Sequence, residues 1–296
     1  MNESVNNEDP GWIFRKEKKM GLRIATNIAS QTVQKNLKEV SSKADASLEK
    51  LSSGKRITKA ADDAAGLAIA TNLEAQTRGL RQATRNANDG ISLVQTAEGG
   101  LNEVSNILVR MRELTIQASS DTVGDTERGF LDKEYQQLQT EVDRISDSTT
   151  FNGSQLLNGE GSGSMDFQVG AFGGEQNRIT FDSSESNASA SNIGISGTGI
   201  SEKGDALDSI ASIDEAINAV SGQRANLGSI QSRLQSTVSN LEVQTINQDS
   251  ARSVIQDVDV AAESAKMAAS SVVKSAGIST LAQANALPNN ALRLIS

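Results

Sequence analysis

The sequence predicts a mainly α-helical protein in which long antiparallel helices form a coiled-coil-like bundle, with paired N- and C-terminal helices and a small β-hairpin in the middle. Three observations support this fold class. Apolar residues recur at alternating spacings of three and four over most of the chain, which is the helical period. Between Pro10 and Pro288 no proline interrupts the helical pattern. Aromatic residues make up 3% of the 296 residues, which suits narrow helix–helix contacts better than a broad core.

Residues 1–19 differ from everything that follows them. They are highly charged, show no helical periodicity and contain Trp12, the single tryptophan of the chain. Met20 stands directly before the first periodic segment. We interpret residues 1–19 as a disordered extension or a misassigned start, and we expect the protein to begin at Met20.

The first periodic segment predicts an amphipathic helix over residues 22–52 that ends near Gly54. A second amphipathic segment lies near the other end of the chain. The apolar positions of the two segments are Val33, Leu37, Val40, Ala44, Leu48 and Leu51, and then Val254, Val258, Ala261, Ala265, Ala268 and Val272. Because long apolar stripes need partner helices, we expect the two helical ends of the chain to pack on each other. An ordinary helical bundle would show similar stripes.

Three further periodic segments lie between these ends, from Val94 to Ala118, Leu131 to Ile145 and Leu227 to Leu241. The region of residues 151–201 is different, because the helical period disappears there and Gly and Ser dominate. Within it, residues 165–181 alternate apolar and polar side chains around Gly173-Gly174, which predicts a β-hairpin with a glycine turn.

Composition excludes several kinds of chemistry. The chain has no histidine and no cysteine, which excludes His-based catalysis, His-ligated zinc, disulfides and thiol chemistry. The formal net charge of -9 disfavours nucleic-acid binding, and no apolar run is long enough for membrane insertion. Residues 51–66, LSSGKRITKAADDAAG, superficially resemble a phosphate-binding loop. However, Glu49 occupies the position of that motif's first glycine, and Arg56 the position of its Ser or Thr.

Several motifs, in the same order, resemble bacterial flagellin. They are LSSGKRITKAADDAAGLAIA at residues 51–70, RNANDGISLVQTAEGGLNEVSNILVRMRELTIQAS at 85–119, EVDRIS at 141–146, TTFNGSQLLNG at 149–159, ARSVIQDVDVAAESAKMA at 251–268 and STLAQANALPNNALRLIS at 279–296. The resemblance covers Met20 to the end of the chain except for the central region. The chain departs from the family in its 19-residue extension and in a centre too short for the large outer domain that many flagellins carry.

The resemblance implies a division into two domains. Residues 20–63 and 256–296 would form an inner domain of terminal helices. Residues 64–255, including the β-rich segment 151–201, would form a second shell with helices over about 64–118, 128–147 and 209–255. Gly54 and Gly66 would serve as the joint between the shells, because glycine accepts backbone conformations that other residues resist.

The resemblance also implies a function. The chain would be a structural subunit without enzymatic activity or cofactors, secreted through the flagellar export channel and polymerising into the extracellular filament. The residues expected to form its assembly surface are Val33, Leu37, Val40, Leu48, Leu51, Val254, Val258, Ala261, Ala265 and Val272. Further partners would be an export chaperone and the cap and junction proteins. A host Toll-like receptor would recognise Arg110, Leu114 and Glu141.

Three alternatives to this function remain. The first is a hook–filament junction protein, which shares similar terminal helices. The second is a coiled-coil adhesin or surface-layer protein, which would lack the paired terminal motifs. The third is a flagellin with a zinc-peptidase centre, which needs a His-x-x-x-His pair that this sequence does not contain.

Overall fold

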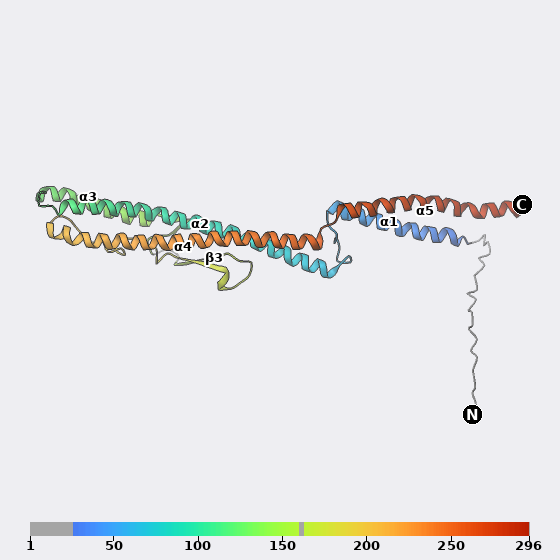
Figure 1. The fold of residues 1–296 in the computed structure, drawn as a ribbon, viewed down its shortest axis with the longest axis horizontal. Coiled ribbons are helices and arrows are strands. Elements are labelled where there is room, and N and C mark those ends of the chain that lie inside the picture. Colours follow the sequence, from blue (N-terminus) through green and yellow to red (C-terminus); the bar gives the residue numbers. More distant parts are fainter. Residues whose placement is uncertain (1–25, 160–162, 296) are drawn as a thin grey trace, which may run out of the picture. The chain divides into compact units, whose positions relative to one another are not determined.

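The computed structural model describes residues 26–159 and 163–295. The expected extension 1–19 and the expected start at Met20 lie outside the described residues. Within the described ranges the long helices are α1 (Ile28–Ser53), α2 (Ala64–Ala118), α3 (Asp125–Ser148), α4 (Lys203–Gln256) and α5 (Val260–Ile295), as Figure 1 shows. The prediction of a mainly α-helical fold with a small β-hairpin region is confirmed.

The chain divides into two compact units, which we call the terminal unit and the central unit. The terminal unit comprises the described parts of Met1–Ala64 and Gln256–Ser296, and the central unit comprises Ala65–Ile255. The terminal unit therefore contains α1 and α5 from opposite ends of the sequence, which lie side by side in Figure 1. The central unit contains nearly all of α2 and α4, together with α3 and the strands.

In the terminal unit, α1 and α5 pack antiparallel. The side-chain amide of Asn27 donates to the carbonyl of Ala284 at one end of the pair (2.8 Å), and the N–H of Val258 donates to the carbonyl of Gly54 at the other (3.1 Å). Asn27 also caps α1, because its side-chain oxygen accepts from the N–H of Ser30. The helix expected over residues 22–52 is thus seen from Ile28, with Thr26 and Asn27 outside it.

In the central unit, α2, α3 and α4 surround the main apolar core, and Leu80, Ala83 and Leu241 form a smaller cluster. The periodic positions found in the sequence supply the main core, and the buried residues include Leu101, Val104, Leu108 and Met111 of α2, Tyr135 and Val142 of α3, and Leu227 and Leu234 of α4. Polar contacts show that α2 and α4 are antiparallel: Lys203 bonds Asp121 at one end (2.6 Å), and Arg81 bonds Asp249 toward the other (2.6 Å).

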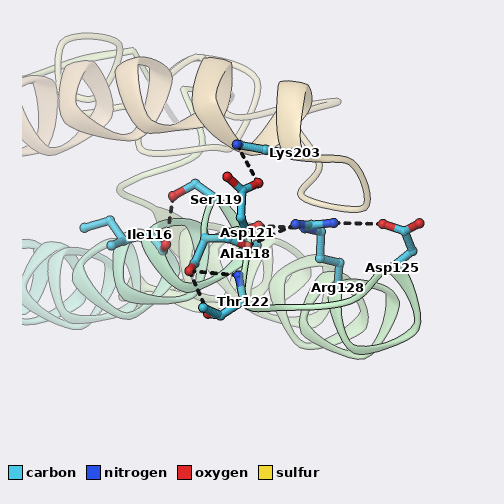
Figure 2. Close-up of polar contacts among 9 residues, drawn as sticks. Ile116, Ala118, Ser119, Asp121, Thr122, Asp125, Arg128 and Lys203 are labelled. Carbon is cyan, nitrogen blue, oxygen red and sulfur yellow. Dashed lines mark hydrogen bonds and ion pairs between the residues drawn. The ribbon is translucent and has the colours of Figure 1, made fainter.

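The turn between α2 and α3 is held by a buried arginine (Figure 2). The guanidinium of Arg128 donates to the carbonyls of Ala118 (2.8 Å) and Ser120 (3.0 Å) and to the carboxylate of Asp125 (2.8 Å). Ala118 is the last residue of α2, where the helix supplies no N–H partner for the carbonyl, and Ser120 lies in the turn that follows. Arg128 therefore caps α2 from the second turn of α3, a role that the sequence pattern did not predict.

Two antiparallel hairpins follow α3. The predicted hairpin is formed by β3 (Ser164–Gln168) and β4 (Arg178–Asp182), with Gly173-Gly174 in the connecting loop. A second, shorter hairpin pairs β1 (Thr150–Phe151) with β2 (Ser154–Gln155) and was not predicted. Both are attached to the helices: Phe167 of β3 packs against Gly90 of α2, and Leu156 and Leu157 after β2 are fully buried.

Candidate functional site

The α1 face expected to take part in assembly is partly covered by α5. Val33, Leu37, Val40 and Leu51 are half-buried, whereas Leu48 is 58% exposed. Gly277 of α5 lies against Leu37, and a Cβ at position 277 would stand 3.2 Å from Leu37 Cδ1. The terminal helices therefore approach closely at Gly277, and α5 partly covers every residue of the predicted apolar face of α1 except Leu48.

The face of α5 that contacts α1 mixes apolar residues with small and polar ones. Its less exposed residues repeat at helical spacing and include Glu263, Met267, Ser270, Gly277, Leu281 and Ala284. Three side-chain hydrogen bonds connect the helices: Ser47 donates to Glu263 (2.7 Å), Lys274 to Ser41 (3.3 Å) and Ser30 to Asn285 (2.7 Å). Polar pairing thus adds to the apolar contacts of the pair and helps to set its register.

The apolar stripe predicted on α5 lies on the other side of the helix. We call Ala261, Ala265, Ala268 and Val272 the α5 stripe; all four are exposed, Val272 by 70%. Each helical residue is rotated by about 100° from the last. Ala265, two residues from both Glu263 and Met267, therefore points away from α1. The expectation that this stripe packs on α1 within one subunit is wrong, because α5 packs on α1 through the face that carries Glu263, Met267 and Leu281.

Val254 and Val258 do not extend the stripe. Val254 lies in α4 of the central unit and is 78% exposed, whereas Val258 lies in the short break between α4 and α5. The break forms because residues 256–258 pair with the segment after α1. The carbonyl of Gln256 accepts from the N–H of Arg56 (2.6 Å), and Lys55 and Asp257 form an isolated β-bridge.

Glu263 is a buried acid within the contact between α1 and α5. Its carboxylate accepts from the hydroxyl of Ser47 (2.7 Å) and pairs with Lys266 (3.0 Å). The hydrogen bond from Ser47, and then the interaction with Lys266, lower the pKa of Glu263 below its ordinary value, against the opposing effect of burial. A charged Glu263 therefore stabilises this helix pair.

The connector between α1 and α2 is ordered by Gly54 and Asp62. Gly54 ends α1 in a left-handed conformation (φ 69°), which glycine adopts without strain. Asp62 accepts from the N–H of Thr58 (3.1 Å), the hydroxyl of Thr58 (3.0 Å) and the N–H of Lys59 (3.2 Å), and these bonds lower its pKa. Sequence reasoning missed Asp62, although an acid placed just before a helix is a common signal of such a turn.

Gly66 does not supply a joint. It is buried within α2, which begins two residues earlier at Ala64, and its backbone is not among the left-handed glycines. The expected role of Gly66 as a point of backbone freedom is therefore wrong, because the helix already fixes its conformation.

The three residues expected to contact a host receptor differ in exposure. Arg110 is exposed and bonds Glu134 of α3 (2.9 Å) and Glu113 (3.0 Å), and these bonds raise its pKa. Glu141 is paired with Arg144 (2.7 Å). Leu114, by contrast, is 1% exposed and belongs to the core of the central unit. The expectation that Leu114 offers apolar area at the surface is wrong.

No described helix is long and apolar enough to cross a membrane.

Comparisons with known proteins identify a single family for both ends of the chain. Residues 24–162 match the family model of the bacterial flagellin N-terminal helical region, and residues 210–295 match that of the C-terminal helical region.

Individual relatives agree with this match. A flagellin of Halalkalibacterium halodurans is 41% identical over 269 residues, which cover 91% of this chain and 98% of the relative. A flagellin of Bacillus subtilis is 37% identical over 312 residues, covering 93% of this chain and 100% of the relative. A solved structure described as a flagellar hook-associated protein of Vibrio parahaemolyticus has a TM-score of 0.55 at 17% identity, over 66% of this chain and 99% of that one. This last likeness shows a shared fold alone.

Proposed function

The chain belongs to the bacterial flagellin family of structural, non-enzymatic filament subunits, and we propose that it polymerises through the outward-facing side chains of α1 and α5. Self-polymerisation into the flagellar filament is the family's function. The surface of this chain that forms the contacts between subunits is what we propose here. No observation favours the alternative of a hook–filament junction protein.

The exposed apolar surface of the terminal unit is the observation that carries this proposal. The α5 stripe, together with Val260, Val273 and Ile278, remains exposed after α5 has packed on α1, and so does Leu48 of α1. Burial of one Val or Leu side chain stabilises an interface by about 1.5–3 kcal/mol before ordering costs. Small residues such as Ala265 and Ala268 also let a neighbouring helix approach closely.

A second copy of the same chain is the occupant that the family implies. A contact repeated head to tail without closing into a ring produces an open helical polymer. We propose that the terminal unit forms the innermost part of that polymer and the central unit the next shell, with the connector at Gly54 between them. The separate apolar core of the central unit supports this division, because that unit has buried its own stripes.

Charge substitutions in the α5 stripe test the proposal. Val272→Asp combined with Ala265→Asp should leave the helical content and melting of the soluble subunit unchanged while abolishing filament formation in a sedimentation assay. Ser271→Asp is the matched control, because Ser271 is exposed beside Val272 but outside the stripe. This control should polymerise more readily than the stripe variant. Equal polymerisation of the stripe variant and the unsubstituted protein would contradict the proposal.

Further partners follow from the same surface. An exposed apolar helix face must be kept from premature association, which suits an export chaperone, and the ends of the polymer need cap and junction proteins with matching surfaces. We also propose secretion to the extracellular filament. A chaperone that protects the α5 stripe should lose affinity for the Val272→Asp, Ala265→Asp variant in a pull-down assay.

Recognition by a host Toll-like receptor is proposed on a narrower set of residues than the sequence implied. Arg110 and Glu141 are polar and reachable on α2 and α3, whereas Leu114 is not. Arg110→Ala should weaken receptor signalling by the folded subunit, because a guanidinium can form a forked contact with a carboxylate. Unchanged signalling would refute the role of Arg110.

A further inference from the structure

We propose that the turn at Asn152-Gly153 is a site of spontaneous deamidation, where Asn152 is converted to aspartate or isoaspartate. The turn joins β1 to β2 and is exposed. Asn152 has a φ of 50° and is the only non-glycine residue with a positive φ among the described residues, and Gly153 follows with a φ of 83°. These values match a tight two-residue hairpin turn, for which Asn-Gly is the favoured pair.

The reacting groups of this turn are unrestrained. Within residues 26–159 and 163–295, neither the side-chain amide of Asn152 nor the N–H of Gly153 has a hydrogen-bond partner. A Cβ added at Gly153 would meet no atom within 4 Å, so solvent and base can reach the amide nitrogen. The Asn152 side chain is therefore free to turn its carbonyl carbon toward that nitrogen.

A second Asn-Gly pair in the same region is restrained. The side-chain amide of Asn158 donates to Gln155 (2.7 Å), and Asn158 is only half-exposed. Gly159 is enclosed, because a Cβ at this position would stand 2.5 Å from Asn187 Nδ2. The two pairs share the same reactive dipeptide, so any difference between their rates in the folded protein reports the structure around them.

The reaction needs only water and base. The Gly153 amide nitrogen loses its proton to base and attacks the side-chain carbonyl carbon of Asn152, forming a new N–C bond and a succinimide ring. The bond from that carbon to the side-chain nitrogen breaks, and this nitrogen takes up a proton from water and leaves as ammonia. One water molecule then opens the ring at either carbonyl, which yields aspartate or isoaspartate.

The surrounding fold confines the change to the tip of the hairpin. Leu156 and Leu157 at the base are fully buried, and the hydroxyl of Ser146 donates to the carbonyl of Leu157 (2.6 Å). The central unit should therefore stay folded after the reaction and gain one negative charge at the tip.

Peptide mapping by mass spectrometry of the full-length wild-type protein tests this site. Samples are incubated at mildly alkaline pH, either folded or unfolded in urea, and deamidation at Asn152 and Asn158 is followed over time. We expect Asn152 to react several-fold faster than Asn158 in the folded protein, and the two rates to converge in urea. Asn152→Gln should remove the faster-forming acidic species on ion exchange, and Asn152→Asp should coelute with the aspartate product.

Two results would overturn the proposal. One is an equal or faster reaction of Asn158 in the folded protein, and the other is an unmodified Asn152 under conditions where Asn158 has reacted. Because wild-type protein supplies both sites, neither result depends on whether a variant folds.

Discussion

Gly99 and Gly100 are neighbours in α2, yet their surroundings differ completely. A Cβ at Gly99 would meet no atom within 4 Å, whereas a Cβ at Gly100 would stand 2.7 Å from Leu157 Cδ1 and from Thr149 Oγ1. Gly100 is therefore the residue that lets the base of the first hairpin lie directly on α2. Gly99 carries the helix-weakening cost of glycine without any packing benefit.

Alanine substitutions should separate these two roles. Gly99→Ala should raise the free energy of unfolding by about 0.5–1 kcal/mol, because alanine favours the helix. Gly100→Ala should lower it by about 1–3 kcal/mol, because overpacking forces Leu157 or Thr149 to move. Urea unfolding of both variants tests the prediction. A change in the free energy of unfolding with the same sign in both variants would contradict it.

Glu263 gives the pair of terminal helices a dependence on pH. Because its pKa is lowered in the folded state, the charged acid contributes stability above its ordinary pKa of 4.5, and this contribution is lost as pH falls through the lower folded value. We expect Glu263→Gln filaments to lose less thermal stability on acidification than wild-type filaments. Asp45→Asn, an exposed change on α1, is the control and should behave like the wild type. An unchanged pH dependence of the Glu263→Gln filaments would contradict this role.

At the scale of elements, the turn between α2 and α3 depends on one side chain. Arg128→Met should lower the free energy of unfolding by about 1–3 kcal/mol, because the carbonyl of Ala118 loses its donor and that of Ser120 keeps only the N–H of Val123. Arg144→Met is the matched control, since Arg144 is exposed on the same helix and should change stability by less than about 0.5 kcal/mol. Similar melting temperatures for the two variants would show that Arg128 is not a cap.

The helices of the central unit were predictable because local spacing and burial agree. The row from Val94 through Leu108 is apolar at the helical period and is buried at every step. The break at residues 257–259 does not show in the apolar spacing, which runs through Val254, Val258 and Ala261 without interruption; the boundary expected at residues 255 and 256 came from the family resemblance instead. Backbone pairing with residues 54–56, distant in the sequence, creates the break.

The short first hairpin and the orientation of α5 were missed for different reasons. Asn152-Gly153 is a strong turn signal, but strands of two residues are too short to show alternation. From its spacing alone, the apolar side of α5 was expected to pack on α1. In the structure this side is exposed, and polar pairs such as Ser47 with Glu263 connect the helices instead; such pairs between distant residues cannot be read from the spacing. Of the residues expected to form the assembly surface, Leu48, Ala261, Ala265 and Val272 are exposed on α1 and α5. Val33, Leu37, Val40 and Leu51 are half-buried, and their role in assembly stays a prediction.

At the scale of the whole molecule, the two units differ in net charge and in how their exposed apolar side chains are arranged. Residues 65–255 contain 25 acidic and 13 basic residues, so the net charge of the central unit opposes close approach of its copies. The central unit has also buried its main apolar stripes. Exposed large apolar side chains remain on both units, among them Phe130 and Val243 of the central unit. On α5, exposed apolar residues follow one face of the helix as the α5 stripe, and we propose this face as the main source of the attraction that assembles the filament.

Removal of the terminal helices tests this account most directly. A chain lacking residues 20–52 and 256–296 retains the core of the central unit but loses the α5 stripe and Leu48. We expect a soluble, helical monomer that melts cooperatively in circular dichroism and forms no filaments in sedimentation. Loss of the helical signal would show that the central unit does not fold alone. Long filaments from the truncated chain would contradict the central claim that the terminal helices drive polymerisation.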